Sequence, residues 1–149
     1  MNTQERSFET LIAEANEIAD ARTKKANELK DKFYNEILPQ FAESMSKLGA
    51  EAFEFCTREP VTTLDYYIAE PLHGYYVQIT NKGELLEADK TEWTPEGIQL
   101  KYHLTSAKRE DLSFLGTLEL CEQIPGRLKR LIEKAEAETE KATSITDEL

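Results

Sequence analysis

The sequence predicts an α+β fold in which a long N-terminal helix and a C-terminal helix flank a central antiparallel sheet. Three observations support this order: apolar residues recur at helical spacing near both ends, the middle consists of short aromatic or β-branched runs, and turn residues separate those runs. We expect a single domain over residues 1–149, with frayed tails at about 1–6 and 143–149.

The first helix is predicted over residues 7–38. Ser7 is a favourable N-cap, and the apolar side chains that follow it fall on one helical face. Residues 20–28 interrupt this face with polar side chains, so we expect the helix either to protrude from the core there or to pack through alanines and the aliphatic stems of lysines. Pro39 removes a helical hydrogen bond, so the helix is predicted to be kinked or broken near it, or to restart with Pro39 in a new first turn.

The central sheet is predicted to be a meander of four or five short strands. The strands are antiparallel because the segments between them are too short for crossover helices. The turn TNKGE at residues 80–84 is the strongest hairpin signal in the chain. The predicted strands are residues 52–57, 64–70, 74–80, 84–88 and 98–104.

The C-terminal helix is predicted to be broken near Pro125, because proline and the glycine after it both disfavour a helix interior. Residues 127–142 follow with strong helical character. Residues 117–122 alternate between apolar and polar side chains, so the pattern leaves open whether this segment is helix or strand.

The net charge of −11 is concentrated in the middle of the chain. Residues 51–105 hold ten acidic and four basic side chains, a net charge of −6. Such a field repels nucleic acid and anionic membranes and speeds encounters with basic partners. The sequence begins with polar and charged residues and contains two cysteines far apart, so we expect a cytoplasmic protein with reduced thiols, without a signal peptide or a membrane span.

Four of the six tyrosines lie in the stretch LDYYIAEPLHGYYVQI, residues 64–79. Alternation along the predicted strands places Tyr66, Tyr75 and Tyr102 on the inward, apolar face. The opposite face would carry Tyr67 and Tyr76 with Gln78, Gln99, Lys101 and His103. This second face is either an aromatic contact surface, a pair of cross-strand contacts on a solvated sheet, or a surface covered by a helix.

A second candidate site is the predicted loop ELLEADKTEWTPEG, residues 84–97, where carboxylates surround the single tryptophan, Trp93. Acidic groups around an aromatic side chain can bind a basic, partly apolar peptide. We expect instead that Trp93 folds back and caps the core, because a large apolar residue in a loop is often an anchor. An exposed Trp93 is the alternative.

The sequence has no motif for a metal, a cofactor, a phosphate loop or a catalytic nucleophile, so we expect none of these. The sequence favours a non-enzymatic acidic protein that binds a basic protein surface. Inhibitors, immunity proteins and phage host-takeover proteins belong to this class. The basic partner could itself be a nucleic-acid-binding protein. The candidate contact residues are Tyr67, Tyr76, Gln78, Lys101, His103, Glu87, Asp89, Glu92 and Trp93.

Two other functions stay open. The first is a helical scaffold or holdase-type chaperone that acts as a homo-oligomer through its long terminal helices. The second is a small enzyme of unknown chemistry, for which Tyr67, Tyr76, Lys101 and His103 on one sheet face would be the place to look.

Overall fold

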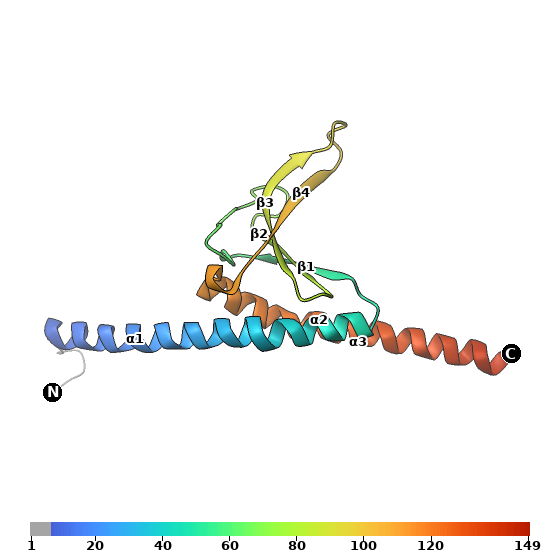
Figure 1. Ribbon diagram of the computed structural model, residues 1–149, viewed down its shortest axis with the longest axis horizontal. Coiled ribbons are helices and arrows are strands. Elements are labelled where there is room, and N and C mark those ends of the chain that lie inside the picture. Colours follow the sequence, from blue (N-terminus) through green and yellow to red (C-terminus); the bar gives the residue numbers. More distant parts are fainter. Residues whose placement is uncertain (1–6) are drawn as a thin grey trace.

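The computed structural model describes residues 7–149 and confirms the α+β class, with the helices below a four-stranded sheet (Figure 1). The predicted tail at 1–6 lies outside the described residues, and 143–148 form the end of the last helix. Between residues 7 and 149, no helix is both long and apolar enough to cross a bilayer. The elements in chain order are α1 (Phe8–Lys32), η2 (Phe33–Ile37), α2 (Leu38–Lys47), β1 (Ala52–Thr57), β2 (Tyr75–Thr80), β3 (Leu85–Trp93), β4 (Leu100–Ser106), η3 (Arg109–Asp111) and α3 (Phe114–Glu148).

The interruption predicted near Pro39 is confirmed as a single π-helical turn, η2. The N–H of Leu38 donates to the carbonyl of Phe33, five residues earlier, instead of the four residues of an α-helix. The chain resumes as α2 at Leu38, so Pro39 lies in its first turn, where a missing N–H costs little. The wider turn therefore accommodates the proline without ending the helix.

The break predicted near Pro125 is wrong, because α3 continues through this residue. Pro125 is exposed, while Ile124 on one side and Leu131 on the other are buried in the core. Burial of these side chains holds both halves of α3 in place and offsets the lost hydrogen bond. Segment 117–122 is helix, with Leu120 fully buried and Leu118 37% exposed, so the alternating apolar side chains lie on opposite helical faces.

The sheet is an antiparallel meander in the order β1-β2-β3-β4, and β1 matches its predicted bounds. The segment predicted as a strand at 64–70 is not one, since it makes a single bridge, between Ile68 and Gly74. Asp65 has a positive φ of 50°, which turns the chain away from an extended path. Side chains of this segment pack on the sheet instead of extending it.

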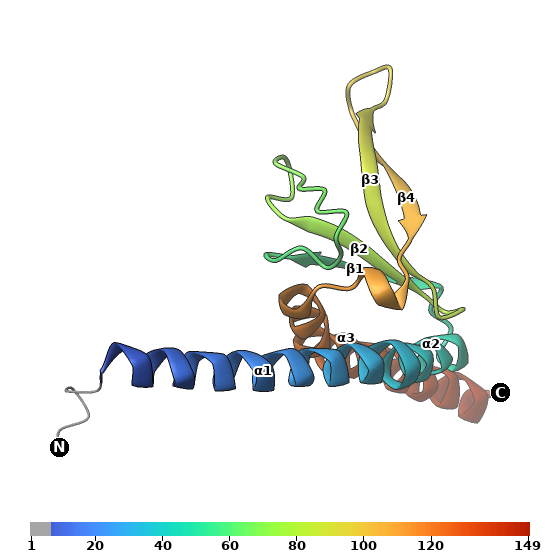
Figure 2. The ribbon, with the colours of Figure 1, turned by 60° about the vertical axis from the view of Figure 1, so that its left-hand side comes forward.

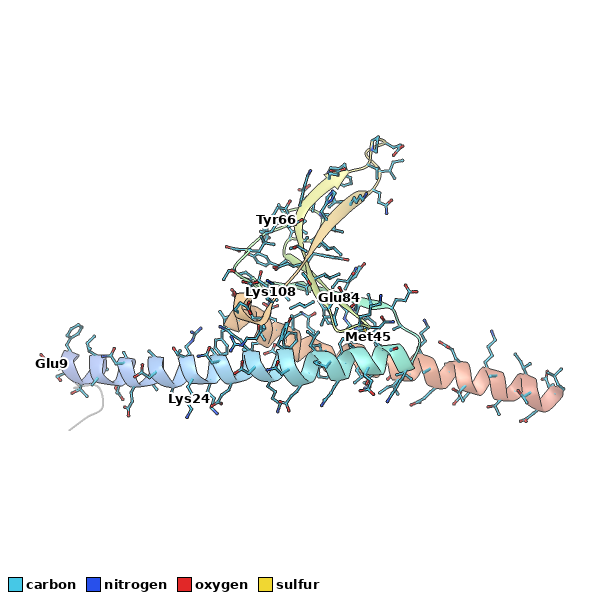
Figure 3. All side chains as sticks on the ribbon, viewed as in Figure 1. Glu9, Lys24, Met45, Tyr66, Glu84 and Lys108 are labelled. Carbon is cyan, nitrogen blue, oxygen red and sulfur yellow. The ribbon has the colours of Figure 1, made fainter. Side chains whose placement is uncertain are left out.

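The main core lies between the helices and the inner face of the sheet. Phe41 of α2 stacks on Phe53 of β1, with ring centroids 5.7 Å apart. Met45 and Ile79 are fully buried nearby, and Figure 3 shows Met45 between α2 and the strands. The odd-numbered residues of β1 and β2 therefore form the inner face of the sheet. They lie opposite one another across the two strands, as Phe55 and Val77 do.

The two long helices run in the same direction but are staggered. Near the start of α3, the Arg22 guanidinium lies 4.7 Å from the centre of the Phe114 ring. At the other end, Leu48 and Ile132 line one groove. Residues 8–21 of α1 therefore project beyond the start of α3, and the last turns of α3 project beyond α2 (Figures 1 and 2). The protrusion predicted at residues 20–28 is therefore wrong, because α1 meets the start of α3 there, with Arg22 over Phe114 and Ala26 buried. The alternative, packing through alanine, is the one observed.

The start of α3 packs directly on the segment that leaves β1. A Cβ on Gly116 would overlap the backbone of Pro60 and Val61. One turn later, the Glu119 carboxylate accepts hydrogen bonds from the N–H groups of Arg58 (2.9 Å) and Glu59 (2.7 Å). The missing side chain at Gly116 therefore lets α3 approach the backbone of the segment after β1, and the hydrogen bonds to Glu119 stabilise this contact.

We predict that Gly116→Ala destabilises the fold by about 3 kcal/mol, because the added methyl group displaces backbone atoms. The matched control is Gly126→Ala in the same helix, where a Cβ would meet nothing within 4 Å. This control should raise stability by about 0.5–1 kcal/mol through helix propensity. Urea unfolding measures both, and equal effects of the two substitutions would contradict the close approach.

Candidate protein-binding site

The outer face of the sheet carries a second, smaller core. The rings of Tyr76 and Tyr102 stack 4.3 Å apart, and Ala88 of the strand between them is buried with Tyr76 and Ile68. Tyr66 packs at the edge of this cluster, and its hydroxyl lies 3.1 Å from Oγ1 of Thr91. The outer face is therefore covered by the segment between β1 and β2, and not by a helix (Figure 3).

The predicted assignment of Tyr102 to the face opposite Tyr76 is wrong, because the two rings stack on one face. The apolar face of β4 packs into the second core and not into the main one. Alternation shows that a strand has an apolar face, but it does not show which of two cores that face joins. Lys101 and His103 consequently lie on the other side of the sheet from Tyr76 and Gln78. The contact face predicted from these four residues is not assembled.

Tyr76 was predicted to be exposed or helix-covered, but it is a buried structural residue, 7% exposed. Burial, together with a hydrogen bond to Glu54, raises the pKa of its phenol to about 12, although Gln78 also donates to its hydroxyl, at 3.3 Å. Tyr67 is half-exposed and meets the ring of Tyr75 edge-on at 5.5 Å. Tyr76 and Gln78 therefore stabilise the sheet.

The upper part of the β3–β4 hairpin forms an arm, residues 89–103, that rises away from the helices (Figure 2). Most of the loop predicted at 84–97 is in fact strand β3, which pairs with β4 as far as Trp93 and Leu100. An irregularity between Ala88 and Lys90 shifts the register at the base of this hairpin arm. The turn at its tip is closed by a 2.8 Å hydrogen bond from the N–H of Thr94 to the carbonyl of Gln99.

Two large apolar side chains are exposed at the end of the hairpin arm. Trp93 is 56% exposed and Ile98 is 82% exposed. The prediction that Trp93 caps the core is wrong, because the arm carries it beyond the reach of the main core. Ile98 was not among the candidate residues predicted from the sequence. Its position directly after Pro95-Glu96-Gly97 was the available signal, but the alternation of β4 suggested an inward-facing residue.

The candidate acidic residues differ in their surroundings. Glu92 pairs with Lys90, whose Nζ lies 3.7 Å from its carboxylate, and Nε2 of His103 lies 3.4 Å from the same carboxylate. Asp89 is exposed at the register shift. Glu87 lies away from the arm, where it accepts a 2.6 Å hydrogen bond from the Thr62 hydroxyl, and burial raises the pKa of its carboxyl.

Side chains that could bind a metal ion do not cluster in the described part of the chain. Over residues 7–149, no three histidine, cysteine, aspartate or glutamate side chains gather as metal ligands would. Burial raises the pKa of both the Cys56 and Cys121 thiols, which lowers the fraction of reactive thiolate at neutral pH. The hairpin arm is therefore the most distinctive exposed feature of the sheet.

No known protein family, curated protein or solved structure matches this chain. Its function must therefore be inferred from its own residues and their arrangement.

Because Trp93 is the single tryptophan and is exposed, we predict that its fluorescence in the native protein resembles that of a tryptophan in water. Acrylamide should quench it nearly as well in the native as in the urea-unfolded protein. A blue-shifted native emission that is protected from acrylamide would show that Trp93 is buried.

We predict that Tyr76→Phe destabilises the protein by about 1 kcal/mol at pH 7, through loss of its hydroxyl hydrogen bonds. The wild-type phenol has a pKa of about 12 when folded, against 10.0 for an ordinary tyrosine, so the unfolded chain loses this proton first. Wild-type stability should consequently fall between these two pH values, and the gap to Tyr76→Phe should shrink. Urea unfolding at several alkaline pH values measures this, and a constant gap would contradict it.

Proposed function

We propose that this protein is a non-enzymatic binding protein that engages a basic protein surface through its hairpin arm. The observation that carries the proposal is the exposure of Trp93 and Ile98 at the end of an ordered hairpin. Such a protein would act as inhibitors and immunity proteins do, by occupying a surface that its partner needs. The two unpaired thiols fit a reducing compartment, so we place it in the cytoplasm.

The geometry of the hairpin arm suits an interface anchor. Tryptophan is enriched among the residues that contribute most binding energy, and a partner would cover both Trp93 and Ile98 together. Paired strands hold Trp93 opposite Leu100, and the stack of Tyr76 on Tyr102 supports the base of the arm. A surface that is already ordered loses little conformational entropy when it binds.

The charge of the sheet region favours a basic partner. Residues 51–105 have a net charge of −6, most of it outside the hairpin arm, which holds three acidic and two basic side chains. This field attracts a positively charged protein and raises its association rate at low salt. A nucleic-acid-binding protein is one class of partner with such a surface, whereas nucleic acid itself would be repelled.

The arrangement of reactive groups supports a role without catalysis. Tyr76 is buried on one side of the sheet, whereas Lys101 and His103 lie on the other, so the enzyme site considered from the sequence does not form. The raised pKa of each thiol also makes it a weak nucleophile.

We predict that Trp93→Ala/Ile98→Ala weakens partner binding about 30-fold or more, since a central anchor contributes about 2 kcal/mol. Tagged wild-type and variant proteins would first be compared for capture of basic proteins from a lysate of the source cell or its host. The dissociation constant of the purified partner would then be measured at two salt concentrations, and high salt should weaken wild-type binding.

The matched control is Tyr67→Ala, which removes an exposed aromatic side chain outside the hairpin arm. Circular dichroism and urea unfolding should show that all three proteins fold equally well. Equal binding by the arm variant and the wild type would rule out the arm as the contact site. Loss of binding in Tyr67→Ala alone would move the site to the segment between β1 and β2.

A further inference from the structure

The open edge of β1 carries backbone groups that no strand pairs. In the described part of the chain, β1 is the first strand of the sheet, so one of its sides has no neighbouring strand. The carbonyl of Cys56 accepts a 3.2 Å hydrogen bond from Nε2 of Gln123 and therefore points away from β2. Because backbone groups alternate in direction along an antiparallel strand, those of Ala52 and Glu54 point the same way. Within residues 7–149, the outward N–H and C=O groups of Ala52 and Glu54 have no hydrogen-bond partner.

Helix α3 follows this edge and leaves a groove beside it. Near Cys56 the two elements touch, and the Arg127 guanidinium lies 5.3 Å from the centre of the Phe55 ring. Toward the start of β1, an open groove of about 500 Å³ lies between them. The side chains that line it include those of Glu51, Ala52, Phe53, Arg130, Leu131 and Lys134. An extended segment in this groove would therefore lie alongside β1.

The face of α3 beside the groove carries three basic side chains, Arg127, Arg130 and Lys134, which we call the basic stripe. They recur at three- and four-residue spacing and so share one helical face. The neighbouring carboxylates Glu122 and Glu133 lie roughly 90° or more around the helix axis from this face. Over the described residues, no carboxylate forms an ion pair with the basic stripe. The stripe is therefore an unneutralised basic surface on an acidic chain.

We propose that the open edge of β1 binds an extended acidic segment of another protein, which adds to the sheet as a further strand beside the basic stripe. In this arrangement, the outward groups of Ala52 and Glu54 hydrogen-bond to the backbone of the segment, and α3 forms the second wall of the site. Among the described side chains that line the groove, Arg130 and Lys134 outnumber the one carboxylate, Glu51. Salt screens charges beyond roughly 8 Å, so these local groups outweigh the net negative charge of the chain.

The alternation of an added strand defines which segment fits. Every second side chain points toward α3 and meets the basic stripe, so an acidic residue is favoured there. The side chains between them lie on the outer face beside Glu54, whose carboxylate is hydrogen-bonded to Tyr76. Another carboxylate beside Glu54 is repelled. The segment that fits therefore alternates acidic side chains with neutral or basic ones.

Amide NMR of the full chain with the capped peptide Glu-Thr-Glu-Thr-Glu-Thr-Glu tests this proposal. The peptide should shift the amide resonances of residues 52–56 and of the basic stripe, and high salt should weaken its binding. Arg130→Gln/Lys134→Gln replaces exposed side chains, so it should fold normally and weaken binding about fivefold. The matched control is Lys24→Gln/Lys32→Gln, which removes the same charge from exposed positions of α1 and should leave binding nearly unchanged.

Methylated peptides distinguish strand addition from simple attraction between charges. Alternate backbone N–H groups of an added strand point toward β1. Methylating the backbone nitrogens of either the threonines or the glutamates should therefore abolish binding, whereas methylating the other set should preserve it.

Three results would overturn the proposal: no shift at residues 52–56 with millimolar peptide, equal binding of the two methylated peptides, or equal weakening by both protein variants. Tighter binding of a short single-stranded DNA than of the peptide would also overturn it, because the basic stripe would then serve a nucleic acid.

Discussion

Phe41 of α2 meets two aromatic rings of β1, and this contact joins the helix layer to the sheet. Its ring stacks on Phe53 and meets the edge of Phe55 at 6.3 Å between centroids. Met45 and Ile79 are completely buried beside it. This core lies between the paired strands β1 and β2 and the middle of the helix layer. The outer parts of the long helices and of the β3–β4 hairpin therefore extend past it.

The exposed surfaces of the molecule follow from this limited core. The second core, around the stacked rings of Tyr76 and Tyr102, stabilises the sheet on the side that the helices leave uncovered. It extends along the hairpin arm as far as Leu100, which pairs with Trp93, so only the tip of the arm lies beyond it. A small domain thereby presents the exposed aromatic side chain of its hairpin arm and the basic stripe of α3 in different places, where separate partners can reach them.

Much of the fold could be predicted from periodicity and turn residues, including the order of elements, the bounds of β1 and the interruption near Pro39. Segment 64–70 could not be distinguished from a strand, because Ile68 covers a sheet face and so alternates as a sheet residue does. The site was predicted only in part. The alternation of β4 showed that Tyr102 lies on an apolar face, but which core that face joins depends on distant residues. The exposure of Trp93 was only the alternative to core capping, because it depends on how far the hairpin extends.

The continuous helix from α1 to α2 also fixes a distance within the molecule. At 1.5 Å per residue, the segment from Ala15 to Ala26 spans roughly 17 Å. The exposed Phe8 at the start of α1 therefore lies roughly 27 Å along the helix axis from the buried Ala26. The length of one helix thus sets how far the exposed apolar side chains of α1 lie from the core.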